Sequence, residues 1–333
     1  MMELRAPFLT ATLVSIVLGT VIAWTRNDAF NPAYFLLALL GGAFAHLGTN
    51  IANDYYDHKS GNDEINKEFV RPFSGGSRTI QLGLLKPHEV LLGSLFFFGA
   101  ATLIGLYLTF ISGPLLPIFI AVGLVSGFFY TAPPFNWVSK GIGEFLVGIN
   151  FGALMTLGAY YVQTQALAIE PVLASIPVSL LIAGVLYINE FPDYAADKAV
   201  GKKTLVVRLG RDKAVYGYAL IVLGAYVSVF IAVLFGVAPL YVLLALVPLP
   251  LAFESVRHAF KFHSKSSSLV PSNAVTIVLH LVTSLLISFG YLMSRFETVS
   301  LGYFVALIAV VTCALFTARS FLQIRKARIL MST

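Results

Sequence analysis

The chain has 333 residues, of which 58% are hydrophobic and only 11% are charged. Soluble domains carry about 25% charged residues, so this composition excludes a water-soluble globule and makes a lipid bilayer the expected solvent. The formal net charge of +6 is interpreted as a signal of membrane topology, and it gives no reason to invoke nucleic acid. The single cysteine, Cys313, excludes an intramolecular disulfide and a cysteine-based metal site.

Ten apolar runs are long enough to cross a bilayer, because a spanning helix needs about 20 apolar residues. In chain order they cover residues 7–25, 33–53, 89–111, 114–131, 143–163, 170–190, 213–236, 238–255, 273–294 and 300–319. The first run is interpreted as a retained helix, since no small-residue cleavage site follows it. The pattern predicts an all-α fold, a polytopic transmembrane bundle of nine to ten helices, in a single membrane-embedded domain over residues 1–333. Run 300–319 is the candidate extra helix.

The distribution of basic residues predicts the orientation. If the N-terminus is inside, all 22 Lys and Arg residues except Arg26 and Arg295 lie on or at the edge of the cytoplasmic face. Cytoplasmic loops carry such an excess, and an extra or missing helix in the middle would scramble it. The chain is therefore expected to be a multi-pass protein of the cell's inner, cytoplasmic membrane. Its long polar loops, 54–88 and 191–212, are expected to carry the chemistry on the cytoplasmic side.

A first cluster of amides and carboxylates stands where the second run ends. Asn50, Asn53, Asp54 and Asp57 are spaced at i, i+3, i+4 and i+7, so all four project from one face if the helix continues. Amide and carboxylate oxygens are hard ligands that suit Mg²⁺.

A second cluster follows the sixth run. Asn189, Asp193 and Asp197 are spaced at i, i+4 and i+8, again on one helical face, and Pro192 predicts a break or kink because it lacks a backbone donor. Both clusters contain the pattern Asn-x₃-Asp, which suggests a weak internal repeat whose two halves face one another. Facing carboxylates repel unless a cation lies between them. The sequence therefore predicts a Mg²⁺–diphosphate site.

Basic residues flank both clusters. Arg71 and Arg78 follow the first cluster within a glycine-containing loop, where a backbone can approach an anion closely and arginine offers a two-pronged phosphate contact. Lys198 and Lys203 follow the second cluster. The alternative interpretation is topological, since cytoplasmic loops are basic in any membrane protein.

These clusters resemble the two motifs of the UbiA superfamily of intramembrane prenyltransferases. The first motif, NDxxDxxxD or NDxxDxxxGxD, is similar to Asn53-Asp54-x-x-Asp57-x₃-Gly61-x-Asp63. The second, DxxxD followed by a Gly/Lys/Thr stretch, is similar to Asp193-x₃-Asp197-x₃-Gly201-Lys-Lys203-Thr204. The resemblance covers most of the chain and implies a UbiA-type bundle with two pseudo-repeated halves.

The resemblance implies that a polyprenyl diphosphate binds through Mg²⁺ to both motifs, ionises to an allylic cation and pyrophosphate, and prenylates an aromatic acceptor. The expected catalytic residues are Asn53, Asp57, Asp193 and Asp197. The expected metal ligands are Asn53, Asp54, Asp57, Asp63, Asn189, Asp193 and Asp197. The expected diphosphate-binding residues are Arg71, Arg78, Tyr130, Lys140, Lys198 and Lys203.

The spacing Gly61-x-Asp63 resembles the branch of the family that prenylates 1,4-dihydroxy-2-naphthoate on the way to menaquinone, so this acceptor is the expected one. The same chemistry on 4-hydroxybenzoate, homogentisate or an archaeal glyceryl-lipid phosphate is an open alternative. A cation-coupled transporter is a second alternative, because repeats and membrane acids also suit a carrier, although carriers place such acids near the middle of the bilayer.

Overall fold

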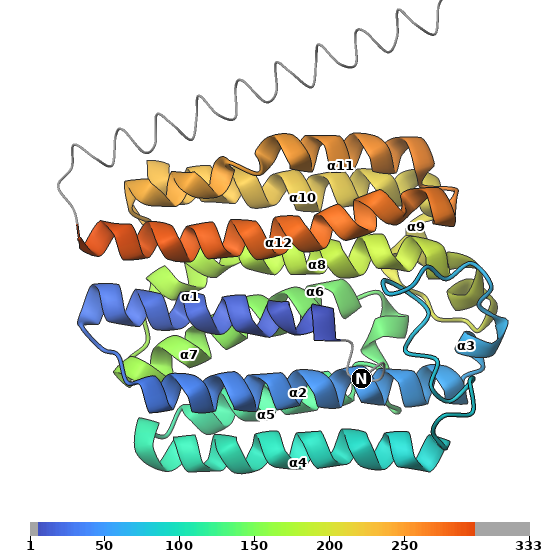
Figure 1. The fold of residues 1–333 in the computed structure, drawn as a ribbon, viewed down its shortest axis with the longest axis horizontal. Coiled ribbons are helices and arrows are strands. Elements are labelled where there is room, and N and C mark those ends of the chain that lie inside the picture. The colour runs from blue at the N-terminus through green and yellow to red at the C-terminus, as the bar shows by residue number, and fades with distance from the viewer. Residues whose placement is uncertain (1–5, 297–333) are drawn as a thin grey trace, which may run out of the picture.

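The computed structural model describes residues 6–296, which fold into a bundle of helices whose long axes run side by side (Figure 1). The uninterrupted long helices are α1 (Thr10–Asn27), α2 (Pro32–Lys59), α4 (Pro87–Ser112), α5 (Leu116–Phe128), α8 (Ile169–Ala199), α10 (Arg211–Leu234) and α12 (Ser266–Arg295). Two further spans are composite, namely α6 (Gly143–Gly148), η3 (Ile149–Leu154) and α7 (Met155–Thr164), and then η4 (Leu240–Leu246) and α11 (Leu249–Phe262). The short elements are η1 (Ala6–Leu9), α3 (Asn62–Ile65), η2 (Trp137–Lys140) and α9 (Leu205–Leu209).

Every predicted run except 300–319 coincides with a helix or a composite span, and 300–319 lies outside the described residues. Within the described part, 7 spans are long and apolar enough to cross a membrane, while α1 and α5 are shorter, with 18 and 13 residues. The prediction of an all-α polytopic membrane protein is therefore confirmed.

The fifth predicted run is not a regular α-helix. Residues Ile149–Leu154 form a π-helical segment, η3, between α6 and α7. There Gly152 packs against α8 so closely that a Cβ atom at this position would lie 2.6 Å from the Cα of Ser179. Such wide turns frequently occur at functional sites. This one carries Asn150, whose side chain lines the cavity described below.

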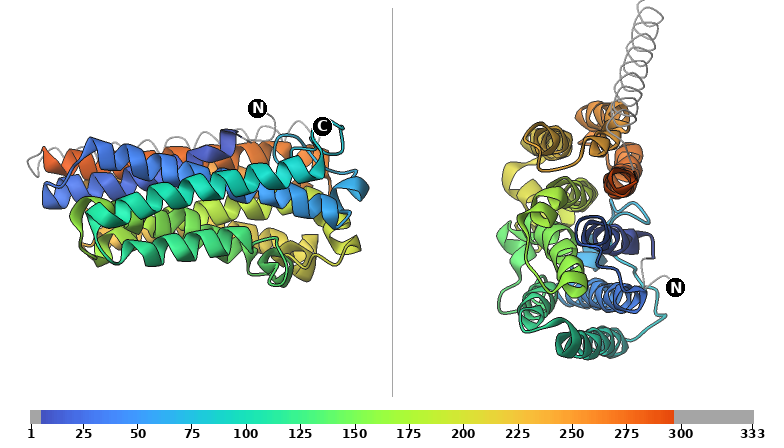
Figure 2. Two further views of the ribbon diagram at one scale, coloured as in Figure 1. Left: turned by 90° about the horizontal axis from the view of Figure 1, so that it is seen from below. Right: turned by 90° about the vertical axis from the view of Figure 1, so that its left-hand side faces the viewer.

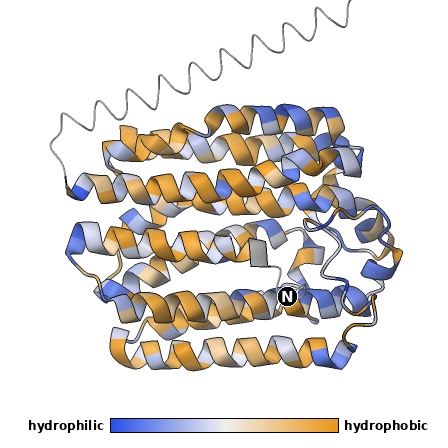
Figure 3. Ribbon diagram, in the orientation of Figure 1, coloured by the Kyte–Doolittle hydropathy of each residue, from blue (hydrophilic) through white to orange (hydrophobic). Residues whose placement is uncertain are grey.

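The most buried span is α8, which packs against α10, α12 and the composite span α6–η3–α7. Figure 3 shows hydrophobic residues along the length of the helices and hydrophilic residues gathered at the end that carries α3. The left-hand view of Figure 2 shows the connection between α2 and α4 at that same end. The C-terminal ends of α2 and α8, which hold the two predicted clusters, are therefore brought to one end of the bundle.

Candidate active site

The first cluster lies on the C-terminal part of α2, which continues as a helix to Lys59. Asn50, Asn53 and Asp57 line a cavity inside the bundle. The Asn53 Nδ2 atom donates a hydrogen bond to Asp57 Oδ2 at 3.1 Å. Their spacing of three and four residues places these side chains on one face of the helix, as expected from the sequence.

Asp54 belongs to the same motif but does not line the cavity. Its side chain is buried, and the backbone N–H of Ser77 donates to it, 3.3 Å from each carboxylate oxygen. In this structure Asp54 fastens the loop between α3 and α4 to the end of α2. Its role as a metal ligand stays a prediction.

The second cluster lies on α8, which runs without interruption through Pro192 to Ala199. The predicted break is therefore wrong. Because Pro192 has no N–H, the carbonyl of Ile188 loses its helical partner, and Asn273 Nδ2 on α12 donates to that carbonyl at 3.1 Å. The same nitrogen donates to Asn189 Oδ1 at 2.7 Å. A side chain from a neighbouring helix thus supplies the donor that the proline removes.

Amide groups from the connection after α2 hold the carboxylates of α8. Asn189, Asp193 and Asp197 line the same cavity as the first cluster. Asn62 Nδ2 donates to Asp197 Oδ1 at 2.8 Å, and Asn66 Nδ2 donates to Asp193 Oδ1 at 2.6 Å. The sequence analysis missed these two asparagines, because only the tertiary fold brings α3 against α8.

The last acid of the first motif, Asp63, also lines the cavity. It sits on α3, which begins after Gly61 with φ of 76°, a conformation that glycine adopts without strain. Arg78 Nη1 donates to the Asp63 carbonyl at 2.9 Å, and Gln81 Nε2 donates to Asp63 Oδ2 at 3.3 Å. The loop that carries Arg78 is therefore fastened beside the carboxylates.

Lys202 lies between the two clusters. Its ammonium nitrogen is 3.0 Å from both carboxylate oxygens of Asp57 and 3.7 Å from Asp197 Oδ1. Burial lowers the pKa of Lys202, but the Asp197 and Asp57 carboxylates outweigh that effect and raise the pKa well above its usual value. The predicted diphosphate ligands Lys198 and Lys203 do not line the cavity, whereas Lys202 does.

Three other predicted diphosphate-binding cations also lie away from the cavity wall. The guanidinium carbons of Arg71 and Arg78 are 5.9 and 4.4 Å from the ring centre of Phe69. The Lys140 ammonium is 6.0 Å from the ring centre of Phe135. These side chains rest against aromatic rings, so a contact between them and a diphosphate stays a prediction.

Tyr130, the remaining predicted diphosphate ligand, lines the cavity just after α5. The charged groups of Lys202, Glu190 and Glu144 lie near its ring hydroxyl.

The sequence analysis did not select Glu190 or Glu144 as a site residue. Glu190 is 5% exposed and lines the cavity from α8, while Glu144 is 2% exposed on α6. Glu144 Oε1 accepts a hydrogen bond from the backbone N–H of Leu205 at 2.8 Å. An acid inside an apolar run was the signal that could have found both glutamates.

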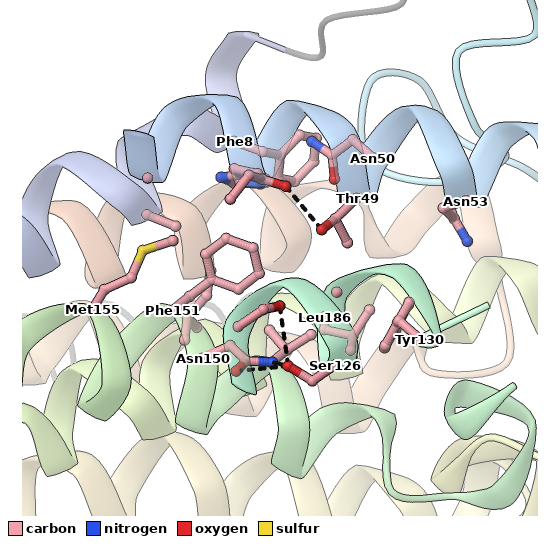
Figure 4. A pocket seen from close by; sticks show the side chains of 18 of the residues that line it. Phe8, Thr49, Asn50, Asn53, Ser126, Tyr130, Asn150, Phe151, Met155 and Leu186 are labelled. Carbon is pink, nitrogen blue, oxygen red and sulfur yellow. Dashed lines mark hydrogen bonds between the residues drawn. The ribbon is translucent and has the colours of Figure 1, made fainter. Parts of the chain in front are cut away.

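The whole cavity has a volume of about 320 Å³, and behind the two clusters it continues as an apolar chamber. Its lining on α2 reaches from Asp57 to Ala38, which corresponds to about 28 Å at a rise of 1.5 Å per residue. Most of the wall is Gly, Ala, Leu, Ile and Phe. Ser126 and Asn150 are polar exceptions that satisfy one another, with Asn150 Nδ2 donating to Ser126 Oγ at 2.8 Å (Figure 4).

The oxygen atoms around Lys202 are suitable ligands for Mg²⁺. Carboxylates from α2 and α8 converge on one cation, the lysine ammonium, so this position favours positive charge. Across residues 6–296 no three Asp, Glu, His or Cys side chains form a ready-made metal group. Amide oxygens and the ligand would therefore complete the shell, and Mg²⁺ ordinarily keeps positions for water and phosphate. The residues fit a Mg²⁺ ion held together with a diphosphate.

Several known proteins are similar to this chain in sequence or in fold. The sequence profile of the UbiA prenyltransferase family matches residues 12–270. The 1,4-dihydroxy-2-naphthoate octaprenyltransferase of Bacillus subtilis (strain 168) is 28% identical over 295 residues, which are 88% of this chain and 92% of that protein. A UbiA homolog from Aeropyrum pernix K1 shares the fold with a TM-score of 0.62 at 16% identity, over 86% of this chain and 98% of that one.

A second solved structure, a UbiA homolog from Archaeoglobus fulgidus bound to DMAPP and Mg²⁺, gives a TM-score of 0.55 at 16% identity, over 86% of this chain and 98% of that one. The family profile covers well over half of the chain, and the described helices have the same fold as these homologs. This membrane protein is therefore an enzyme that belongs to the UbiA prenyltransferase family.

Proposed function

We propose that this enzyme transfers a polyprenyl group from a polyprenyl diphosphate to an aromatic acceptor, and that the acceptor is 1,4-dihydroxy-2-naphthoate. One observation carries the proposal: the acidic clusters of α2 and α8 meet at the polar end of one long apolar cavity. A polyprenyl diphosphate has the same division, with a charged head and a long apolar tail.

The diphosphate head is proposed to bind between the two clusters. The residues that would hold Mg²⁺ with it are Asn53, Asp57, Asp193 and Asp197. When bound, Mg²⁺ neutralises the diphosphate and stabilises it as a leaving group. Lys202 stands between Asp57 and Asp197 and can donate charge-assisted hydrogen bonds to the same phosphate oxygens.

The prenyl tail is proposed to lie in the apolar chamber. As the C1–O bond breaks, its electron pair leaves with the pyrophosphate and the allylic group becomes a cation, which water would quench. The apolar wall keeps water away from this cation. An electron-rich ring carbon of the acceptor then supplies the electron pair for the new carbon–carbon bond. That carbon next loses its proton, or its carboxylate as CO₂, and the electrons of the broken bond restore the aromatic ring.

The choice of acceptor rests on sequence likeness. The Bacillus subtilis relative carries the naphthoate acceptor in its name, and the spacing Gly61-x-Asp63 points to the same branch. We also propose that this end of the bundle, and the N-terminus, face the cytoplasm, which the basic bias of the loops supports. Because the chain belongs to an enzyme family, we do not retain the alternative function of a cation-coupled transporter.

A direct assay tests the proposal. Purified protein in detergent micelles is incubated with labelled polyprenyl diphosphates of several lengths, Mg²⁺, and a panel containing the naphthoate, 4-hydroxybenzoate, homogentisate and a glyceryl-lipid phosphate. We expect prenylated naphthoate as the main product. Transfer to another member of the panel alone would contradict the naphthoate assignment, and no transfer to any of them would contradict the proposed function.

Two substitutions connect that assay to the structure. Asp57→Asn and Asp193→Asn are each expected to lower turnover by about 100- to 1000-fold, because each removes charge where the leaving diphosphate is stabilised. Asp212→Asn is the matched control, since Asp212 lies at the start of α10 with a side chain that is 92% exposed. If all three variants turned over as fast as the unmodified enzyme, the site would be misplaced.

A further inference from the structure

Glu190 lines the cavity but takes no part in the proposed diphosphate site. Its side chain is 5% exposed, and within residues 6–296 neither of its carboxylate oxygens receives a hydrogen bond from a donor group. A buried carboxylate without a donor is unfavourable, and buried polar groups in proteins are nearly always paired. The missing donor is therefore expected to come from a molecule that the cavity binds.

The neighbouring Glu144 cannot satisfy Glu190 completely. The two carboxyls are in contact, and of their four oxygens only Glu144 Oε1 has a protein donor, the Leu205 N–H, in the described part of the chain. A single proton shared between the two carboxyls would occupy at most one oxygen of Glu190. At least one oxygen of Glu190 is then left for a ligand.

A second unpartnered group lines the same cavity from another helix. Asn50 lies on α2, one helical turn before Asn53, and its Nδ2 atom is shielded from solvent with no acceptor among the described residues. Figure 4 shows Asn50 on the cavity wall that α2 forms, across from the wall that carries Asn150 and Tyr130. The cavity thus offers one unused acceptor, on α8, and one unused donor, on α2.

The prenyl diphosphate cannot use this pair. Its hydrocarbon tail has no hydrogen-bonding group, and its ionised diphosphate has acceptor oxygens but no hydrogen to donate to a carboxylate. The ligand must therefore carry a hydroxyl for Glu190 and a second oxygen that accepts a hydrogen bond from Asn50. A hydroxyarene with a carboxylate or carbonyl substituent has both.

We propose that Glu190 accepts a hydrogen bond from a ring hydroxyl of the acceptor substrate, while Asn50 donates to a neighbouring oxygen substituent. This inference rests on the proposed function, because it assumes an aromatic acceptor. A hydroxyl that donates to a carboxylate pushes electron density into its ring, which makes the ring carbons better nucleophiles for an allylic cation. Glu190 would thereby select acceptors that carry a free hydroxyl.

Equilibrium binding tests the proposal without turnover. Isothermal titration calorimetry on the full chain in micelles compares 1-hydroxy-2-naphthoate with 2-naphthoate, which lacks only the hydroxyl. We expect the unmodified protein to prefer the hydroxylated ligand by about tenfold or more, the range of a hydrogen bond to a charged group. Glu190→Leu should abolish this preference and Glu190→Gln, which keeps a weaker acceptor, should retain part of it.

Control variants separate recognition from folding. Glu170→Gln changes a glutamate of the same helix at the opposite end, where it pairs with Arg26, and should keep the full preference. Asn50→Leu should instead abolish the preference for 1-hydroxy-2-naphthoate over 1-naphthol, which lacks the carboxylate. If Glu190→Leu weakens both naphthoates equally, or leaves the hydroxyl preference intact, the inference is overturned.

The outcomes also distinguish this inference from the proposed function. A Glu190-dependent preference without any prenyl transfer would support the hydroxyl site and contradict the proposed function. The opposite outcome is prenyl transfer by the unmodified enzyme together with a hydroxyl preference that Glu190→Leu retains. It would support the proposed function and contradict the hydroxyl site.

Discussion

Charged side chains are paired differently at the two ends of the bundle. At the end opposite the clusters, cations and their partners are matched at the surface. Arg26 Nη2 lies 2.9 Å from Glu170 Oε1, and Arg295 Nη1 donates to the carbonyl of Trp24 at 2.7 Å. These contacts pair each of the two arginines with an acceptor from the chain itself.

At the cluster end, negative charge exceeds the positive charge that faces it. Five carboxyl side chains line the cavity, those of Asp57, Asp63, Glu190, Asp193 and Asp197, whereas Lys202 is the one Lys or Arg among its described lining residues. Asparagine amides donate to Asp193 and Asp197. Such an excess is unfavourable without a further cation. The comparison teaches that the chain's own residues pair the charges at one end of the bundle, whereas the excess negative charge at the other end favours the binding of a cation.

Removing Mg²⁺ should have the largest effect on this contrast. With excess EDTA, prenyl transfer is expected to fall by about 1000-fold or more, because the metal stabilises the leaving diphosphate. Added Mg²⁺ should restore the rate, and the thermal unfolding temperature of the protein should change little. Undiminished transfer in EDTA would show that the carboxylates do not act through a metal.

Replacing the central lysine should have the next largest effect. Lys202→Met is expected to lower turnover by about 100-fold, because it removes a positive charge beside the departing diphosphate. Lys203→Met is the control. It should change turnover by less than about threefold, because Lys203 is an exposed surface charge. Since neighbouring carboxylates raise the pKa of Lys202, its charge is present below that pKa and should not limit the alkaline side of the activity profile. Equal losses in both variants would refute the special position of Lys202.

The hydrogen bond from Asn273 to the Ile188 carbonyl, which replaces the N–H that Pro192 lacks, should contribute to stability. Asn273→Leu leaves the Ile188 carbonyl unpaired and is expected to destabilise the fold by about 1–3 kcal/mol. Pro192→Ala restores an N–H to α8, so the double variant should recover part of that loss. Denaturant unfolding in micelles measures both, and an unchanged loss in the double variant would show that the asparagine acts through another contact.

Breaking a pair at the opposite end should have the smallest effect. Arg26→Met is expected to cost at most about 1 kcal/mol, since exposed ion pairs contribute little, and it should leave prenyl transfer unchanged. Assaying this variant beside Lys202→Met compares the two ends in one experiment. A large loss of activity in Arg26→Met would undermine the division between them.

Much of the fold could be predicted because hydropathy reports directly on membrane helices. The spans, the two motifs and their meeting at one end follow from apolar run lengths and from helical spacing. Asn53, Asp57, Asp193 and Asp197 were placed in this way, and all four line the cavity.

Contacts between distant segments could not be predicted in the same way. Lys198, Lys202 and Lys203 look alike in the sequence, and only the turn at Gly201, with φ of 76°, brings Lys202 back between the carboxylates. The unbroken α8 likewise depends on Asn273, whose contact with Ile188 is 85 residues away in the chain. Local rules for proline and for basic loops carry no information about such partners.

The central claim is that α2 and α8 build one diphosphate site, and pyrophosphate binding in the presence of Mg²⁺ tests it most directly. Calorimetry would give the Kd for the unmodified protein, Asp57→Asn, Asp193→Asn and the double variant. When residues act as one unit, the effects of replacing them do not add. Each single variant should therefore bind pyrophosphate about tenfold or more weakly than the unmodified protein. The double variant should bind it no more weakly than the weaker of the two single variants. Losses that multiply in the double variant, or single variants that bind as tightly as the unmodified protein, would contradict a shared site.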